Sequence, residues 1–430
     1  MKQVQPTFLI IANRIFWPPT DGHKVVLFNY CKGLSDRFNC KIHVLAFLES
    51  GQDSSDADNP PDFIDDVRIL EKPCKLEMAK NLLLGCFLGG PIQSALFFKK
   101  KSGEIIRETV SRLNPDYVFF DMARVSDYVK YIKSFRCMTV LYLEDSLSKR
   151  YQRQLSSIDN LNKTGGIAGK YSAELSAGAS KMASFKFIQK LVLRYESRAM
   201  KQLEKLAFLR FDYVLFVSPI EACQLAKEEN AENVFAVPLG VDCEFYASGP
   251  RPIARDNIIS FMGDMGTSAN ADSLRLIVNE ILPLLDDEVI LEVSGNAPDI
   301  LRQEFKSNRR VEFLGRVEDT RESLRSSRVF LCPISYGTGI KTKILEAMAI
   351  GVPLVTNDIG NEGIGLISGE EALVHNSISD LAADVRLLLK DKQYADNLAK
   401  SAQKKAWELF DWEKSFDNFK KIGLDDNFNK

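Results

Sequence analysis

Two lysines stand at the start of a short predicted helix, at the end where cations are least expected. The stretch from Gly337 to Pro353 has the pattern of a glycine-rich turn, a helix, a glycine stop and a new strand. A helix N-terminus has about half a positive charge, so Lys341 and Lys343 break a local rule there. A bound anion removes the conflict, because exposed N–H groups and two ammonium groups can jointly hold a diphosphate.

One carboxylate, Glu346, lies in the otherwise apolar run Ile344–Ile350 of the same predicted helix. A lone acid in such a run needs a polar partner. The hydroxyl groups of a ribose would serve, which makes a nucleoside diphosphate the ligand that fits both features.

This segment resembles the nucleotide-sugar site of the retaining GT-B glycosyltransferases, of the large glycosyltransferase group 1 (family 4) type. The family pattern is Glu-Gly-Phe-Gly, four further residues, and a second Glu in Leu-Glu-Ala-Met-Ala. Glu346 matches the second acid, whereas Thr338 stands where the first acid, which contacts the donor sugar, is expected. The variant Gly-x-Gly-Ile-Lys is similar to that of a bacterial surface-polysaccharide branch.

The bulk composition excludes several classes of protein. At 430 residues the chain has room for two domains, and its 56 basic and 58 acidic residues argue against a nucleic-acid binder. Eight cysteines form no C-x-x-C pair, which predicts reduced core thiols in a cytosolic protein. Three isolated histidines lack metal-ligand spacing, so we expect no metal site; His43 and His375 are assigned structural roles, and only His23 follows a loop of interest.

Strand-like and helical patterns alternate along the chain, which predicts an α/β fold with parallel sheets. The predicted strands are Phe8–Ala12, Lys41–Phe47, Tyr117–Phe120, Met138–Leu143, Tyr213–Val217, Val234–Val237, Ile258–Met262, Ile290–Ser294, Val311–Leu314, Val329–Cys332 and Leu354–Thr356. Because the pattern restarts near residue 258, we predict two Rossmann-like, doubly wound domains, which by resemblance face each other across a cleft. The run Phe8–Ala12 is too short for a signal peptide or a membrane span.

The domain bounds follow from one predicted hinge. Pro238–Asp242 combines proline and glycine and is similar to the interdomain link of the family, although a plain turn is the alternative. We predict an acceptor-binding domain at 1–240, a nucleotide-sugar-binding domain at 241–405, and a C-terminal amphipathic helix at 406–430. By resemblance that helix crosses back to the first domain; capping the second domain is equally compatible with the sequence.

Ligands of open α/β sheets bind at the carboxyl ends of the strands. In the first domain this rule, with the resemblance, selects four acceptor-binding candidates: Arg14, His23, Asp121 and Arg124. Gly22 matches a glycine of the family loop that approaches the donor diphosphate, and a Pro-Gly turn is its alternative. Asp145, with Glu144 second, is the catalytic candidate facing the transferred sugar, and an N-cap of the following helix is the equal alternative.

In the second domain the resemblance assigns the donor-binding residues. Relatives place basic residues after the first strand, where this chain has neither, so Lys341 and Lys343 are expected to supply that charge, and Lys341 is also a catalytic candidate. A solvated helix end is the alternative, more so for Lys343. Alanine at Lys341 is expected to raise the KM or Kd of the donor strongly. The donor-binding candidates are Gly22, Gly263, Gly295, Arg316, Val317, Thr338, Gly339, Ile340, Lys341, Lys343 and Glu346.

The resemblance implies a metal-independent, hexosyltransferase-type enzyme that moves a sugar with retention from a UDP- or GDP-linked donor to a glycan or polyprenyl-linked acceptor. No cofactor is expected beyond this co-substrate. A non-catalytic nucleotide-binding partner of another glycosyltransferase and a nucleotide-sugar epimerase are the alternatives. The basic, apolar stretches Ser94–Leu113 and Lys181–Lys205 suggest contact with an anionic membrane at the inner face of the plasma membrane, although ordinary surface helices are favoured. Lys163–Lys170 has the composition of a mobile loop over the acceptor or of a surface connection.

Overall fold

The computed structural model describes residues 5–49, 51–160, 186–249 and 252–424. Lys163–Lys170 and the first residues of Lys181–Lys205 lie outside these ranges. The chain divides into two compact units: unit 1 contains the described parts of 1–152, 191–238 and 416–430, and unit 2 those of 153–190 and 239–415. The domain bounds 1–240, 241–405 and 406–430 stay a prediction.

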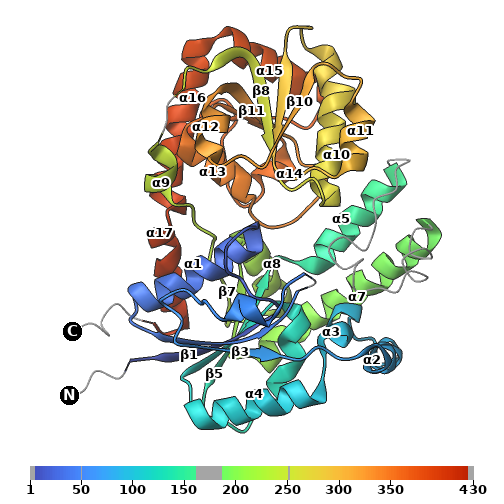
Figure 1. Ribbon diagram of the computed structural model, residues 1–430, viewed down its shortest axis with the longest axis vertical. Helices are drawn as coiled ribbons and strands as arrows, with labels where there is room; N and C mark the ends of the chain where they lie inside the picture. The colour runs from blue at the N-terminus through green and yellow to red at the C-terminus, as the bar shows by residue number, and fades with distance from the viewer. Residues whose placement is uncertain (1–4, 50, 161–185, 250–251, 425–430) are drawn as a thin grey trace. The chain divides into compact units, whose positions relative to one another are not determined.

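Unit 1 is built on a seven-stranded parallel sheet with the order β3-β2-β1-β4-β5-β6-β7 (Figure 1). Its centre is β1, which pairs with β2 on one side and β4 on the other, in parallel. Both faces of such a sheet are covered, so its central strands, such as β1 and β4, are mostly apolar. The strands are β1 (Thr7–Ala12), β2 (Lys41–Phe47), β3 (Asp66–Leu70), β4 (Tyr117–Asp121), β5 (Met138–Glu144), β6 (Tyr213–Phe216) and β7 (Val234–Ala236).

Helices connect these strands and cover both faces, with α1 and α4 on opposite sides of the sheet (Figure 1). Two 3₁₀ segments, Ser54–Ala57 and Ala123–Tyr131, lie between them. The helices are α1 (Gly22–Asp36), α2 (Lys75–Phe87), α3 (Ile92–Phe97), α4 (Lys100–Leu113), α5 (Leu147–Asn160), α7 (Lys186–Arg210) and α8 (Pro219–Glu229). Residues 153–160 of α5 and 186–190 of α7 are grouped with unit 2.

Unit 2 repeats the arrangement around a six-stranded parallel sheet with the order β10-β9-β8-β11-β12-β13. Helices α10 and α11 lie on one side of it and α12 and α13 on the other (Figure 1). The strands are β8 (Arg255–Met262), β9 (Ile290–Ser294), β10 (Val311–Gly315), β11 (Ser327–Cys332), β12 (Leu354–Thr356) and β13 (Leu373–Val374). The helices are α9 (Cys243–Ala247), α10 (Ser268–Leu276), α11 (Asp299–Phe305), α12 (Thr320–Arg325), α13 (Thr342–Ile350), α14 (Asp358–Asn361), α15 (Ile378–Lys390) and α16 (Lys392–Lys405).

The predicted fold class is confirmed: both sheets are parallel and alternate with helices. Every predicted strand is present, with ends that differ by at most three residues. Two edge strands, β3 and β13, were not predicted. Strand β3 alternates exposed and half-buried residues until Leu70, and β13 has two residues, so neither forms an apolar run.

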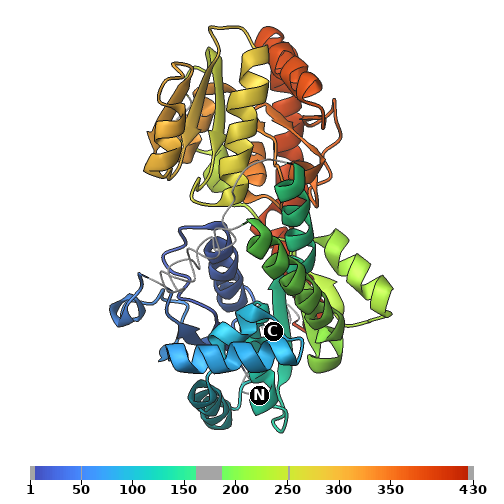
Figure 2. The same ribbon diagram turned by 90° about the vertical axis from the view of Figure 1, so that its right-hand side faces the viewer.

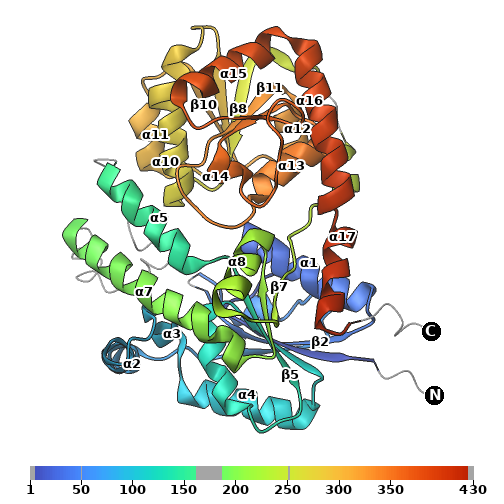
Figure 3. The ribbon, with the colours of Figure 1, turned by 180° about the vertical axis from the view of Figure 1, so that it is seen from behind.

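The single amphipathic helix predicted for 406–430 is wrong, because the chain is extended at Asp411. There Val241 N–H donates to the Phe410 carbonyl (2.7 Å). A π-helical turn, Ala406–Phe410, comes before this point, and α17 (Trp412–Phe416) and a 3₁₀ segment (Asp417–Ile422) come after it (red in Figure 3). Residues 416–424 are part of unit 1, where the Phe419 ring packs edge-on against Tyr30 (centroids 5.2 Å apart).

Some side-chain roles predicted from composition need correction. Cys74, Cys86 and Cys223 are exposed thiols, so the cysteines are not all in the core. The histidine assigned to a satisfied core position on β2, His43, has a buried Nδ1 without a hydrogen-bond partner among the described residues. His375 has the expected structural role, since its Nδ1 lies 2.6 Å from Asp384 Oδ2.

Candidate functional site

The carboxylate of Asp121 is the centre of a buried polar cluster in unit 1. Asp121 is the last residue of β4 and its side chain is fully buried. Its Oδ2 accepts hydrogen bonds from the backbone N–H (3.2 Å) and side-chain Nδ2 (2.8 Å) of Asn13, which follows β1. Its Oδ1 lies 2.8 Å from His23 Nε2. Two neighbouring strands therefore place these groups together at their carboxyl ends.

Arg14 extends the cluster toward two further carboxylates. Its guanidinium donates to Asp21 Oδ1 (2.8 Å) and Glu49 Oε1 (3.0 Å), and its Nη2 lies 3.3 Å from His23 Nδ1. Asp21 also caps α1 by accepting from the Lys24 N–H (3.2 Å). Gly22 is therefore the first residue of α1, not part of an isolated turn.

The ionisation of His23 should be visible in the stability of the protein. Burial disfavours the charged ring, but the Asp121 and Glu144 carboxylates outweigh burial and Arg14 and raise the pKa of His23 above 6.5. The charged ring therefore contributes stability that is complete below pH 6.5 and is lost as the pH rises through the raised value. We expect the thermal midpoint of the parent to exceed that of His23→Gln by the largest amount at acidic pH. This difference should shrink as the pH rises above 6.5.

The matched control is His375→Gln, which also removes a histidine–aspartate pair. A hydrogen bond with Asp384 raises the pKa of His375 too, but the His375 side chain is 44% exposed, so water screens the pair. Its difference from the parent should therefore fall much less over the same pH series. A His23→Gln difference that falls no more than that of His375→Gln would contradict the role of Asp121.

Glu144 occupies an unusual backbone conformation at the end of β5. Its φ is +66°, a left-handed value that costs energy for a residue with a Cβ. Burial, with the Asp145 and Asp121 carboxylates, outweighs His23 and Arg150 and raises the pKa of Glu144. A carboxyl group that keeps its proton to higher pH is suited to proton transfer. Strained backbone and a shifted carboxyl at one residue are typical of a functional position.

Asp145 is almost fully buried and pairs with Arg150 of α5, whose Nε donates to Oδ2 at 2.9 Å. The alternative interpretation of Asp145 as the N-cap of α5 is wrong. The hydroxyl of Ser146, one residue later, accepts from the first-turn N–H of Lys149 (3.4 Å).

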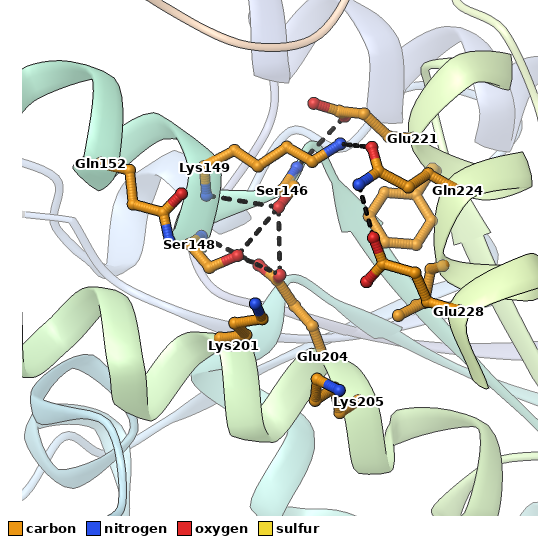
Figure 4. A pocket seen from close by; sticks show the side chains of 12 residues that line it. Ser146, Ser148, Lys149, Gln152, Lys201, Glu204, Lys205, Glu221, Gln224 and Glu228 are labelled. Carbon is orange, nitrogen blue, oxygen red and sulfur yellow. Dashed lines mark hydrogen bonds between the residues drawn. The ribbon is translucent and has the colours of Figure 1, made fainter.

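The start of α5 is fixed by a carboxylate that sequence reasoning missed. Glu204 of α7 accepts from the Ser148 N–H (3.0 Å), the Ser148 hydroxyl (2.6 Å) and the Ser146 hydroxyl (3.0 Å) (Figure 4). These groups border a pocket of about 110 Å³, which Glu221 and Lys149 also line. Glu204 lies in a stretch whose basic and apolar residues predicted a surface helix, so its burial had no sequence signal.

The last acceptor candidate of unit 1, Arg124, has other partners. Its Nε donates to Gln93 Oε1 of α3 (2.7 Å), and its guanidinium lies near the Phe97 ring. The structure thus groups Arg14, His23, Asp121, Glu144 and Asp145 through direct contacts or mutual electrostatic effects, and it directs Arg124 to α3.

In unit 2, glycines end three neighbouring strands and let their backbones approach closely. Gly263 N–H donates to the Ser294 carbonyl (3.0 Å), and Gly295 N–H donates to the Gly315 carbonyl (2.7 Å). Gly295 has φ +113°, and a Cβ there would lie 2.0 Å from the Gly263 carbonyl oxygen. Only glycine fits this edge, which leaves its backbone open to a ligand.

Gly295→Ala is therefore expected to cost more than about 4 kcal/mol of unfolding free energy, the range of severe single substitutions. Gly365→Ala is the matched control, because Gly365 also has a positive φ (+72°) but nothing within 4 Å of a built Cβ. Conformational strain alone should cost about 1–2 kcal/mol there. If chemical denaturation shows equal losses of unfolding free energy for Gly295→Ala and Gly365→Ala, the contact with Gly263 is not the reason that position 295 requires glycine.

Lys343, in the first turn of α13, points to this glycine edge. Its Nζ donates to Asn270 Oδ1 (2.7 Å), lies 4.7 Å from the Phe261 ring centroid, and would be 2.7 Å from a Cβ on Gly263. Burial lowers the pKa of Lys343 against the effects of Cys332 and Glu346. The alternative of a solvated helix end is thus wrong for Lys343, whose ammonium group lies beside the glycine that follows the first strand of unit 2.

Glu346 lies one turn further along α13. Burial raises the pKa of Glu346, although a hydrogen bond with Tyr246 of α9 and the charge of Lys343 oppose this shift. The acid therefore has a protein partner, which the apolar run did not reveal. Neither Tyr246 nor Asn270 was predicted, because each lies far in sequence from α13.

The turn before α13 folds back on itself. Lys341 is the N-cap residue, and its Nζ donates to the carbonyls of Gly339 (2.6 Å) and Thr338 (3.3 Å). Thr338 and Ile340 are buried, each 7% exposed. The predicted glycine stop is confirmed, since Gly351 ends α13 with φ +81°.

Two further donor-binding candidates, Arg316 and Val317, follow β10. Arg316 is exposed and Val317 is half-buried.

Two properties of the described residues concern metals and membranes. Among residues 5–49, 51–160, 186–249 and 252–424, no three His, Cys, Asp or Glu side chains are grouped as metal ligands would be. Within the same ranges, every helix is too short or too polar to cross a bilayer.

Comparison with known proteins identifies the fold. The crystal structure of Anabaena Alr3699/HepE in complex with UDP and glucose superimposes with a TM-score of 0.65 at 14% identity, over 96% of this chain and 98% of that one. The chain has the GT-B fold. Residues 256–391, within unit 2, match the family model of glycosyl transferases group 1.

Curated relatives are similar over shorter stretches. An uncharacterized 44.6 kDa protein in the cps region of Klebsiella pneumoniae is 24% identical over 207 residues, which are 44% of this chain and 50% of that protein. An N,N'-diacetylbacillosaminyl-diphospho-undecaprenol alpha-1,3-N-acetylgalactosaminyltransferase of Campylobacter jejuni is 34% identical over 112 residues, which are 25% of this chain and 29% of the enzyme. The chain thus spans half or less of the length of these two relatives.

Proposed function

We propose that this GT-B protein transfers a sugar from a nucleotide-diphosphate donor to a hydroxyl of a glycan or polyprenyl-linked glycan, with retention at the anomeric carbon. The observation on which this rests is the ammonium group of Lys343, held beside the glycine edge of Gly263 and Gly295. A backbone free of side chains and a nearby cation suit a diphosphate. The match of residues 256–391 to a glycosyltransferase model supports sugar transfer over the nucleotide-binding partner or the epimerase.

In the proposed reaction the bond between the anomeric carbon and the phosphate oxygen breaks, and its electron pair leaves with the nucleoside diphosphate. The acceptor oxygen bonds the anomeric carbon, and its proton passes to the leaving phosphate. Lys343 and the α13 N–H groups would stabilise the developing charge, at roughly 3 kcal/mol per well-placed donor. Front-face departure needs no carboxylate under the sugar and suits Thr338 in place of the family acid, whereas double displacement would need one.

The acceptor and the cellular setting are part of the same proposal. Unit 1 would bind the acceptor through Arg14, His23 and Asp121, with Glu144 or Asp145 facing the sugar. The similarity to an enzyme named for a diphospho-undecaprenol substrate supports a polyprenyl-linked acceptor. The donor would be UDP- or GDP-linked, with no metal or further cofactor, and the protein would act in the cytoplasm at the inner face of the plasma membrane.

The test is a thermal-shift screen of nucleoside diphosphates, followed by nucleotide sugars. A rise of the midpoint with one nucleoside diphosphate, and slow hydrolysis of its sugar conjugate, is the expected result. Binding without hydrolysis or transfer would instead support the non-catalytic alternative. If no nucleoside diphosphate shifts the midpoint, the proposal is wrong.

A further inference from the structure

Helix α2 exposes a group of large apolar side chains on the outside of unit 1. Their exposed fractions run from 53% to 89%, and no residue of α2 is buried. We call this group the α2 patch; it consists of Leu76, Leu83, Leu84, Phe87 and Leu88. Scattered apolar residues are ordinary on a surface, but a contiguous group is typical of an interaction site.

Hydrogen bonds anchor α2 through the side chain of Asn81 and hold the turn that follows the helix at Gly90. Asn81 Nδ2 donates to the carbonyls of Ala95 (3.1 Å) and Phe98 (2.7 Å), and the Tyr195 hydroxyl donates to the Gly90 carbonyl (2.7 Å). Figure 2 shows α2, pale blue, lying across the outside of unit 1, and Figure 1 shows it end-on at the edge. The α2 patch therefore lies on a helix whose position is held by these hydrogen bonds.

The surroundings of the patch are basic. Residues 71–101 contain six lysines and two glutamates, a formal charge of +4 in a chain whose net charge is −2. Lys75 and Lys80 are exposed on α2 itself. Lys100 and Lys101 at the start of α4 are also exposed, but they pair with Glu104 (3.8 Å) and Glu71 (2.8 Å). A partner for this surface must offer negative charge beside an apolar phase.

We propose that the α2 patch docks unit 1 onto an anionic lipid bilayer. Leu83, Phe87 and Leu88 would enter the boundary between headgroups and acyl chains, and Lys75 and Lys80 would lie among the phosphates. Two copies of the chain meeting through this surface would bring charges of equal sign together, which disfavours a dimer. This docking rests on the proposed function, which has the protein act at the inner face of the plasma membrane, and it names the surface that would make that contact. Its test requires neither donor nor acceptor, so it can fail independently of sugar transfer.

Of the two surfaces expected from the sequence, the described part of Lys181–Lys205 does expose apolar side chains, Phe187 (73%) and Leu191 (49%). The stretch Ser94–Leu113 differs. Phe97, beside the lysines of Ser94–Leu113, is buried and packs against Phe47. The lysines remain at the surface, but the apolar part of the interface comes from α2, which no sequence pattern marked as exposed.

The experiment is flotation of the full chain with vesicles of phosphatidylglycerol and phosphatidylcholine in equal parts, at low salt. We expect the chain to float with these vesicles and much less with phosphatidylcholine alone. The double variant Leu83→Ser, Phe87→Ser should lose at least about tenfold in partition coefficient, because inserted apolar area sets the affinity. Ile253→Ser and Ile300→Ser remove equally exposed apolar side chains (93% and 81%) elsewhere and should change it less than twofold.

A second measurement does not depend on the stability of the double variant. Phe87→Trp should give tryptophan emission that shifts to shorter wavelength on addition of anionic vesicles, as the indole leaves water. Lys75→Glu with Lys80→Glu should weaken flotation with anionic vesicles and leave the weak binding to phosphatidylcholine unchanged. Failure of the parent to float with anionic vesicles would overturn the proposal, as would a stable dimer that the Leu83→Ser, Phe87→Ser variant dissociates.

Discussion

Replacement of Lys343 by methionine is expected to lower kcat/KM for the donor by about 10²–10³-fold, the usual effect of losing one preorganised donor to a developing charge. The ammonium group of Lys343 is held by Asn270 beside the Gly263 edge, where a diphosphate is proposed to bind. Direct titration with the nucleoside diphosphate should show the loss as weaker binding.

The fold of this variant should survive. Burial lowers the pKa of Lys343, which means that the native state keeps the charged ammonium at a cost. Methionine has similar length and no charge, so the thermal midpoint should stay unchanged or rise. Lys80→Met, on the exposed face of α2, is the matched control and should leave donor binding unchanged. Full donor affinity in Lys343→Met would remove this lysine from the site.

Asp121→Ala is expected to lower the free energy of unfolding by about 3–5 kcal/mol, typical of breaking a buried pair by removing one partner. The substitution leaves the buried His23 ring and both Asn13 N–H groups without their acceptor. Chemical denaturation of the two proteins measures the difference. Asp121→Asn keeps one acceptor oxygen and should lie between them.

The control for this substitution is Asp127→Ala, which breaks the pair with Arg210 (2.9 Å) near the surface. The two side chains are 39% and 31% exposed, so less than about 1 kcal/mol should be lost. Similar losses for Asp121→Ala and Asp127→Ala would mean that the buried cluster does not support unit 1.

The fold was predictable because buried parallel strands are apolar runs. Phe8–Ala12 shows this in unit 1 and Val329–Cys332 shows it in unit 2. Strand β3 was missed since its residues alternate at an edge, and the exposure of α2 was not predicted at all, for the opposite reason. Its apolar residues have the composition of a core helix, and sequence does not distinguish a covered apolar side from an uncovered one.

The candidate residues were predictable one by one, from their places after strands, but their contacts were not. The pairing of Lys343 with Asn270 spans 73 residues, and that of His23 with Asp121 spans 98. Such partners depend on how strands align across a sheet. Lys341 and Lys343 looked equivalent in sequence, yet one donates to its own turn and the other reaches the glycine edge.

Residues 416–424 have a consequence for how the protein is made. Phe419 packs against Tyr30, the Phe416 ring occupies the space beside Gly33, and the Tyr117 hydroxyl donates to the Ile422 carbonyl (3.0 Å). A ribosome synthesises these residues after all of unit 2. Part of the aromatic core of the nascent unit 1 therefore stays exposed until residues 416–424 are synthesised, whereas unit 2 can complete its own sheet first. Translation pauses after residue 415 should thus leave the earlier-made half of the chain the more vulnerable to proteases.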